Sequence, residues 1–356
     1  MNGDTEEKVS FPIKLKLLVF VIGIIVIIVT VFSIVGYVSC RSIVRDRILN
    51  DINALADSKA GQVTRLIEQD FERTALVASR TKLRECLRDL QEGRGEKQLL
   101  KDKMTKILND ACASVKAIKR IDVCDMQGTV AASTLSENAG RELAETRLFA
   151  EGLKGFCLGE ILLGKNDRPM YEISAPLYDP SGQQDRTIGI AVTCIEITRI
   201  LGVLHNYTGL GETGEVMLCR KTNGEMLVLN SLRHRPGSSL KLRLSRETGH
   251  GSAYLVSGPV SAGKDYRGVD TLFVNKPVPA AGWGLTVKID QDEAFAPVDR
   301  LAMEILIISV LILLVSIPAV IIFARFITFP LERLHEQSRE ISSGNLHSQA
   351  DIAIRD

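Results

Sequence analysis

Two long apolar runs constrain what this chain can fold into more than any other feature of its sequence. Leu17–Val38 contains 22 residues and Ile305–Ala324 contains 20, and neither run holds a charged side chain. An apolar helix of about 20 residues spans the hydrocarbon core of a bilayer. The first run is also longer than the apolar region of a cleaved signal peptide. We therefore expect two uncleaved membrane helices, at 17–39 and 301–325, with the lipid bilayer as a partner.

Two spans would place both chain ends on one side of the membrane and residues 40–300 on the other. Basic residues precede the first span and follow the second, namely Lys8, Lys14, Lys16, Arg325 and Arg333. Such residues favour the cytoplasmic side, and Arg41, Arg45 and Arg47 just beyond the first span weaken this signal. The segment 1–16 is expected to be cytoplasmic, and the family resemblance of the C-terminal segment, given below, decides this orientation.

Composition and motifs exclude several classes of function. The formal net charge of +1 gives no electrostatic reason to expect a nucleic acid partner. The seven cysteines include no Cys-x-x-Cys pair, which argues against a zinc ribbon or attached haem, while a disulfide stays open. The chain has no phosphate-binding loop, no His-Glu-x-x-His and no Gly-x-Ser-x-Gly. We expect no catalytic residue, metal or cofactor within these 356 residues.

Beyond the first span, the sequence has a helical pattern. Residues 41–110 contain no proline, and apolar residues recur near helical spacing. The pattern predicts one long helix over 41–92, continuous with the span, and a second helix over 96–114. Such a helix either forms a dimer seam or packs on its own domain, and both alternatives stay open.

From Ile118 onwards, short apolar segments separated by turn residues predict strands. A first group of predicted strands covers 121–125, 129–131, 159–163, 170–178 and 187–197. A second group covers 214–219, 225–229, 271–274 and 283–289. A helix is predicted over 142–153. The chain therefore belongs to the α+β class, with two tandem antiparallel-sheet units after the long helix.

Five stretches of residues 115–300 resemble the double Cache sensor family, whose two units are PAS-like. They are DMQGTVAAST, FAEGLKG, YEISAPLYDPSGQ with TIGIAV, GETGEVMLCRKTNGEML and VPAAGWGLTVKIDQDEAFAPV. The resemblance implies an extracytoplasmic sensor over 40–300, with a distal unit at about 115–205 and a proximal unit at about 206–295. The distal unit of this family usually holds a small ligand.

The same resemblance implies where that ligand would bind. The candidate side chains are Arg147, Phe149, Tyr171, Ser174 and Asp179. Arg147 would hold a carboxylate in a bidentate pair and Asp179 an ammonium group. The aromatic pair of the amino-acid-binding branch is replaced here by Phe149-Ala150, so another small organic acid is the first expectation and an amino acid the second. Asp179 also fits a simple Asp-Pro-Ser-Gly turn, and Arg147 an ordinary solvated helix position.

After the second span, Ile327, Leu331, Leu334 and Ile341 follow one another at intervals of 4, 3 and 7, which predicts a short coiled-coil seam. A membrane helix followed by Pro-Leu, this seam and Gly-x-Leu resembles the first half of a HAMP domain, the dimeric relay module of bacterial receptors. The resemblance covers 326–356 and implies a homodimer in the bacterial inner (plasma) membrane. Its candidate relay residues are Pro330, Leu331, Leu334, Ile341, Gly344 and Leu346.

The HAMP resemblance also implies an output module beyond Asp356. The first expectation is a histidine kinase, which would bring ATP, Mg²⁺ and a response regulator as partner. The alternatives are a chemotaxis receptor, which recruits a kinase and has no catalytic activity, and a diguanylate cyclase or serine phosphatase. His335-Glu336 does not continue into the phosphoacceptor motif of histidine kinases, so we expect His335 to be an ordinary helix residue.

Overall fold

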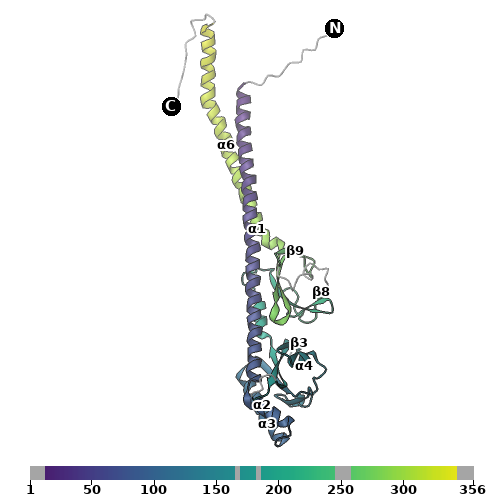
Figure 1. Ribbon diagram of the computed structural model, residues 1–356. Coiled ribbons are helices and arrows are strands. Elements are labelled where there is room, and N and C mark those ends of the chain that lie inside the picture. Colours follow the sequence, from purple (N-terminus) through teal and green to yellow (C-terminus); the bar gives the residue numbers. More distant parts are fainter. Residues whose placement is uncertain (1–12, 165–168, 182–185, 245–257, 343–356) are drawn as a thin grey trace, which may run out of the picture. The chain divides into compact units, whose positions relative to one another are not determined.

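The structure, a computed structural model, describes residues 13–164, 169–181, 186–244 and 258–342. It contains helices and two antiparallel sheets, which confirms the α+β class (Figure 1). The chain forms two compact units. One, the helical unit, consists of Met1–Ile48 and Phe295–Asp356, and the other, the central unit, consists of Leu49–Ala294.

The helical unit contains the first part of α1 (Ile13–Ala78) and most of α6 (Gln291–Ser342). Two segments, Leu18–Ala78 and Gln291–Ala324, are long and apolar enough to cross a membrane, and their most apolar windows are not buried within the protein. The Oγ atoms of Ser33 and Ser309 lie 2.6 Å apart and join the two helices.

The backbone of residues 326–342 continues α6, so Pro330, Leu331, Leu334 and Ile341 are helical. The structure describes no side chains at these four positions, and Gly344 and Leu346 lie outside the described residues. The HAMP interpretation and its dimer seam stay predictions.

The helix predicted over 41–92 is divided in the structure. α1 ends at Ala78, and α2 (Thr81–Gln91) begins after a break. Arg80 has an extended backbone with φ −61° and ψ 108°, and Ser79 Oγ donates to the carbonyl of Leu76 at 3.2 Å. The prediction of one helix was wrong here because a serine that bonds back to the preceding turn can end a helix without proline or glycine.

The first subdomain of the central unit contains a five-stranded antiparallel sheet in the order β2-β1-β5-β4-β3. Its strands are β1 (Ile118–Cys124), β2 (Val130–Ser133), β3 (Cys157–Leu163), β4 (Pro169–Tyr178) and β5 (Thr187–Glu196). All five predicted strands are confirmed with small shifts at their ends. The predicted helix over 96–114 is confirmed as α3 (Lys97–Ser114).

The helix predicted over 142–153 is shorter in the structure, where α4 covers Arg147–Gly152. Thr146 Oγ1 accepts a hydrogen bond from the Phe149 amide at 3.2 Å and so caps the helix. Upstream, Glu142 forms a β-bridge with Thr129. Because these residues are held in bridge and cap conformations, they cannot join the helix.

The second subdomain contains a six-stranded sheet in the order β8-β7-β6-β11-β10-β9. Its strands are β6 (Glu215–Thr222), β7 (Glu225–Val228), β8 (Arg243–Leu244), β9 (Ser261–Lys264), β10 (Asp270–Val278) and β11 (Trp283–Asp290). The connecting helix α5 (Thr198–Leu204) and the short strands β8 and β9 were not predicted. Asn223 and Gly224 turn the β6–β7 hairpin with φ of 52° and 85°, as the Asn-Gly pair predicts.

Side chains alternate across the first sheet and so divide between two faces. On one face, Thr193 Oγ1 of β5 lies 2.6 Å from Thr74 Oγ1 of α1. On the other, Ser174 Oγ of β4 donates to the Leu148 carbonyl of α4 at 2.8 Å. We call these the α1 face and the α4 face.

Candidate functional site

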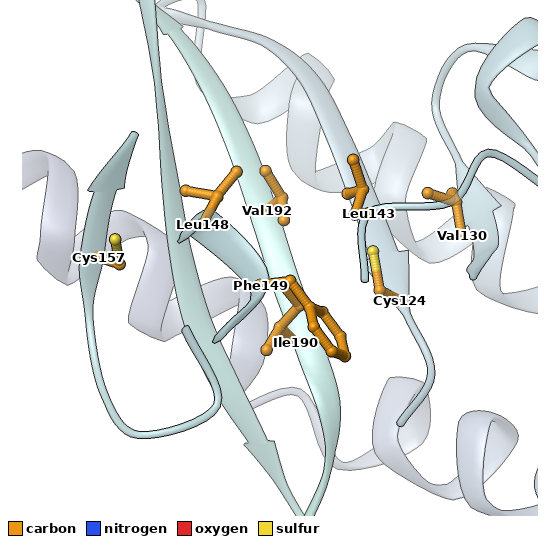
Figure 2. Packing of buried hydrophobic residues seen from close by; sticks show 8 residues of the cluster. All are labelled: Cys124, Val130, Leu143, Leu148, Phe149, Cys157, Ile190 and Val192. Carbon is orange, nitrogen blue, oxygen red and sulfur yellow. The ribbon is translucent and has the colours of Figure 1, made fainter. Parts of the chain in front are cut away.

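A buried apolar cluster lies on the α4 face of the first sheet. Its members come from strands, from α4 and from the segment before α4: Cys124, Val130, Leu143, Leu148, Phe149, Cys157, Ile190 and Val192. Figure 2 shows the Phe149 ring beside Ile190 near the middle, with Cys157 on a strand at one side and Val130 at the other. Small-molecule sites in proteins use mostly apolar walls of this kind with a few polar groups added.

α4 lies very close to the strands beneath it. A Cβ atom added at Gly152 would overlap with the Ser174 hydroxyl, so only glycine allows this approach. Ser174 is fully buried and donates its hydroxyl proton to the Leu148 carbonyl. Ser174 therefore fastens α4 to the centre of the sheet.

A row of charged side chains lies on the same α4 face of the sheet, next to the apolar cluster. Arg120 Nε donates to Asp122 at 2.8 Å, and another nitrogen of the same guanidinium donates to Glu172. Asp122 is 2% exposed and also accepts from Ser133 Oγ at 2.5 Å. Arg120 and Glu172 flank the same residue, Cys194 of the intervening strand. Buried charges persist in proteins when they are paired, and this row has two carboxylates for one guanidinium.

The sequence reading missed this charged row. Arg120 and Asp122 are two positions apart in one strand, and Glu172 lies in another strand, 52 residues after Arg120. Polar residues in an otherwise apolar strand are a signal of a functional face. Only the strand register shows that they meet.

The five residues predicted to bind a ligand do not gather in one place. Phe149 and Ser174 lie on the α4 face, and Arg147 is exposed at the first position of α4. Tyr171 lies on the α1 face, and Asp179 follows the end of β4. The structure thus brings the first three near one helix and separates the other two from them.

Tyr171 connects several elements of the central unit. Its hydroxyl donates to Asp70 of α1 at 2.5 Å, and Asp70 also accepts from Arg73 and Arg199 at 2.6 Å each. Its ring meets the Trp283 ring of the second subdomain edge-on, with centroids 6.0 Å apart. Burial, and next to it the Asp70 charge, raises the pKa of Tyr171 far above its ordinary value. The tyrosine stays protonated and holds the two subdomains and α1 together.

Asp179 forms the turn after β4. Its Oδ1 accepts from the Ser181 amide at 2.9 Å and from the Ser181 hydroxyl at 2.7 Å. Arg88 and Arg186 each place a nitrogen 3.7 Å from the carboxylate. The hydrogen bonds from Ser181, more than the arginines, lower the pKa of Asp179. The turn reading of Asp-Pro-Ser-Gly therefore accounts for this carboxylate.

The second subdomain has its own buried ion cluster. Lys288, 1% exposed, binds Glu215 at 2.6 Å and also Asp265, and its Nζ lies 4.1 Å from the centre of the Tyr266 ring. The Tyr266 hydroxyl donates to Glu215 at 2.7 Å. Burial acts to raise the pKa of Asp265, but hydrogen bonds from Lys288 and Arg267 outweigh it and hold the pKa at about 2.

Glu293 lies in the first turn of α6 and reaches back to the loop before β6. Its carboxylate accepts from the amides of Glu212 and Thr213 at 2.7 and 2.8 Å, and from the Thr213 hydroxyl. Burial acts to raise the pKa of Glu293, and the hydrogen bonds from Thr213 and Glu212 lower it overall. The Glu293 carboxylate thus contacts another loop rather than the amides of its own helix.

In the part of the chain that the structure describes, no group of three or more His, Cys, Asp or Glu side chains is arranged to hold a metal ion. The seven cysteines carry free thiols in the structure. Burial raises the pKa of the Cys124 thiol to about 12 and that of Cys194 to about 11, so both are poor nucleophiles.

Comparison with known proteins agrees with this architecture. The Cache domain family matches residues 41–298, and no curated protein gives a match. The sensor domain of the V. cholerae histidine kinase DctB has 13% identity and a TM-score of 0.51, and the match covers 69% of this chain and 98% of that domain. The ligand-binding domain of the Pseudomonas aeruginosa PAO1 amino acid chemoreceptor PctC, in complex with GABA, has 14% identity and a TM-score of 0.51, with coverage of 68% and 99%.

A third solved structure is similar to the same degree. The sensory domain of a Campylobacter jejuni chemoreceptor has 12% identity and a TM-score of 0.50, and the match covers 71% of this chain and 98% of that domain. At such identities the likeness concerns the fold alone. The family match, in contrast, extends over more than half of the chain. The protein belongs to the Cache domain family.

Proposed function

We propose that this protein is a homodimeric transmembrane receptor that binds a small extracytoplasmic ligand on the α4 face of the first subdomain. The observation that supports this function best is the composition of that face. An apolar cluster adjoins a row of paired charges, of which Asp122 is buried and Arg120 and Glu172 are partly buried, and Ser174 lies under a short helix. A few fixed polar groups beside an apolar wall are what orients a small ligand in a protein.

The proposed ligand is a small organic acid. Arg147 is exposed at the start of α4 and, among the described residues, has no carboxylate partner within an ion pair. A guanidinium of this kind binds carboxylates bidentately. An amino acid is the second candidate, because the row of Asp122, Glu172 and Arg120 has one more carboxylate than guanidinium and so attracts an ammonium group. The amino acid chemoreceptor among the similar structures is consistent with that candidate.

The signal would pass through α6 to the HAMP-like segment. Ligand binding shifts the population between two packing arrangements of the HAMP-like helices only if the ligand binds the receptor more tightly in one of them. We propose a histidine kinase as the output module and a response regulator as its partner, with a chemotaxis receptor, a diguanylate cyclase or a serine phosphatase as alternatives. The heptad spacing of Leu331, Leu334 and Ile341 supports a HAMP relay and hence a dimer.

Binding is tested on a soluble fragment of residues 41–299, which contains the residues 41–298 that match the Cache domain family. Thermal unfolding is measured with panels of carboxylic acids, amines and amino acids, and affinities of hits are measured by calorimetry. Arg147→Gln should weaken binding of a carboxylate ligand about tenfold or more, since a hydrogen bond to a charged group contributes about 1.5–3 kcal/mol. Ser174→Ala should also weaken binding, because it removes the hydrogen bond that fastens α4 to the sheet beneath the ligand.

Lys154→Gln is the matched control, because Lys154 is an exposed cation just after α4 and pairs with Glu151. Affinities equal to that of the parent in both test variants would place the ligand elsewhere. The output is tested separately by reading the coding frame past Asp356 and assaying ATP-dependent phosphorylation of the encoded protein. A long heptad hairpin without a nucleotide-binding domain would overturn the kinase in favour of the chemotaxis receptor.

A further inference from the structure

A group of arginine side chains lies away from the α4 face of the first sheet, between α2 and the end of β4. Arg84 and Arg88 are four residues apart in α2, so they share one face of that helix. Arg84 donates to the Tyr178 carbonyl at 3.4 Å, and Arg88 places a nitrogen 3.7 Å from Asp179. Arg186, which precedes β5, lies 3.7 Å from the other oxygen of the same carboxylate. We call Arg84, Arg88 and Arg186 the arginine cluster.

The guanidinium groups of this cluster are poorly satisfied. Arg88 is 3.5 Å from Asp89 and 3.7 Å from Asp179, which is too long for good hydrogen bonds. The Nε atoms of Arg84 and Arg88 are buried and have no hydrogen-bond partner among the described residues. A buried donor without an acceptor costs free energy, so an added acceptor at these two donors would be stabilising.

Asp179 does not accept a hydrogen bond from either Nε atom. Its Oδ1 is bonded by the amide and hydroxyl of Ser181, and the nearest cluster nitrogens to its two oxygens are 3.7 Å away. Counting Asp179 and Asp89 against the three arginines leaves the group with a net charge of +1. The group therefore has both unused donors and surplus positive charge, which together favour an anion with several acceptor oxygens.

We propose that the arginine cluster binds a small oxyanion, a phosphate or a carboxylate. Planar guanidinium groups match the oxygens of both anions bidentately. The site is distinct from the proposed ligand site. Ile190 of β5 belongs to the α4 face, so the neighbouring Gly189 faces the opposite side of the sheet. Leu87 of α2 packs against Gly189, which places α2 and its arginines on that opposite side. It does not depend on the function proposed for the α4 face.

The test uses the full chain in lipid nanodiscs and isothermal titration calorimetry with inorganic phosphate and, separately, with citrate. Sodium chloride at matched ionic strength corrects for non-specific screening. We expect saturable binding of at least one anion. Binding of phosphate alone would identify a tetrahedral oxyanion site. Binding of citrate alone that persists in the Arg147→Gln variant would identify a carboxylate site separate from the α4 face. Saturation by neither anion would overturn the proposal.

Variants locate the site. Arg88→Gln and Arg84→Gln should each weaken the anion about tenfold or more, because each removes charge-assisted hydrogen bonds. Arg94→Gln is the control, since Arg94 has 66% side-chain exposure and pairs with Glu92 just after α2. If Arg88→Gln fails to fold, Arg186→Gln, at a position with 62% exposure, provides the same test. Anion affinity in these variants equal to that of Arg94→Gln would contradict the assignment.

Discussion

At the scale of single residues, removing the hydroxyl of Tyr171 tests whether this residue stabilises the fold or binds the ligand. It donates to the buried Asp70 and lies on the face away from α4. Tyr171→Phe should therefore lower the free energy of unfolding by about 1 kcal/mol and leave ligand affinity unchanged. Urea unfolding and calorimetry on the 41–299 fragment measure the two quantities. A large loss of ligand affinity with an unchanged free energy of unfolding would show that Tyr171 binds the ligand.

Asp265 predicts how the stability of the second subdomain depends on pH. Its pKa is about 2 in the folded protein, below the ordinary 3.8, so the folded state takes up the proton less readily than the unfolded state. Its stabilising contribution is complete above the ordinary pKa and is lost as pH falls from about 4 towards 2. Asp265→Asn should cost about 2 kcal/mol at neutral pH, by the linkage of pKa to stability.

The measurement is chemical unfolding of the fragment as a function of pH. Asp270→Asn is the control, because Asp270 is an exposed residue at the start of β10. An Asp265→Asn variant with the same acid sensitivity as the parent would show that other carboxylates dominate between pH 4 and 2.

Individual residues also show why only part of the candidate site was predictable. Tyr171 and Ser174 are three positions apart in one strand, and the alternation of a strand alone places them on opposite faces. That separation was available from the sequence once the strand was assigned. The pairing of Arg120 with Glu172 was not, because it depends on a register across three strands.

At the scale of elements, Glu293 fixes the start of α6 against the loop before β6. Gly211 of this loop has φ +63°, and a Cβ added there would overlap with the Glu293 carboxylate. Gly211→Ala and Glu293→Gln should both loosen this contact, because the first displaces the carboxylate and the second removes its charge. Hydrogen–deuterium exchange should become faster at the Glu212 and Thr213 amides in both variants.

Glu212→Gln is the matched control, since the exposed Glu212 contributes only its backbone amide to the contact. Protection of the loop amides at the level of the parent in both variants would mean that packing, and not the carboxylate, holds the helix start.

Elements differ in how well the sequence predicts them. The long strands β4, β5 and β11 were predicted because each is an apolar run bounded by turn residues. The break after Ala78 was not, since α1 ends there through a serine side-chain bond and the burial of Leu83 and Leu87 in α2. The start of α4 is set by the Thr146 cap, a local signal that the apolar pattern of 142–153 obscured.

At the scale of the whole molecule, the two apolar helices of the helical unit meet through a pair of serines. Ser33 and Ser309 lie Oγ to Oγ at 2.6 Å, and each hydroxyl is 2.7 Å from a carbonyl of its own helix. In lipid, such polar contacts hold helices together. With Cys40 changed to Ser, the Ser33→Cys/Ser309→Cys variant should form a disulfide within one chain in membranes under mild oxidation.

Gel mobility with and without reductant measures the crosslink. Ser33→Cys paired with Ser316→Cys is the control, because Ser316 bonds to its own helix at Leu313 and has no described contact with Ser33. Equal crosslinking in both double variants would indicate that the two helices have no fixed register.

The junction of the two subdomains has a spectroscopic consequence. Trp283 is the single tryptophan in the chain, it is 1% exposed, and it lies edge-on against Tyr171. Intrinsic fluorescence excited at the indole band therefore originates from this one junction. A ligand that moves the first subdomain against the second would change the emission without any introduced label, so the native protein contains its own optical reporter of movement at this junction.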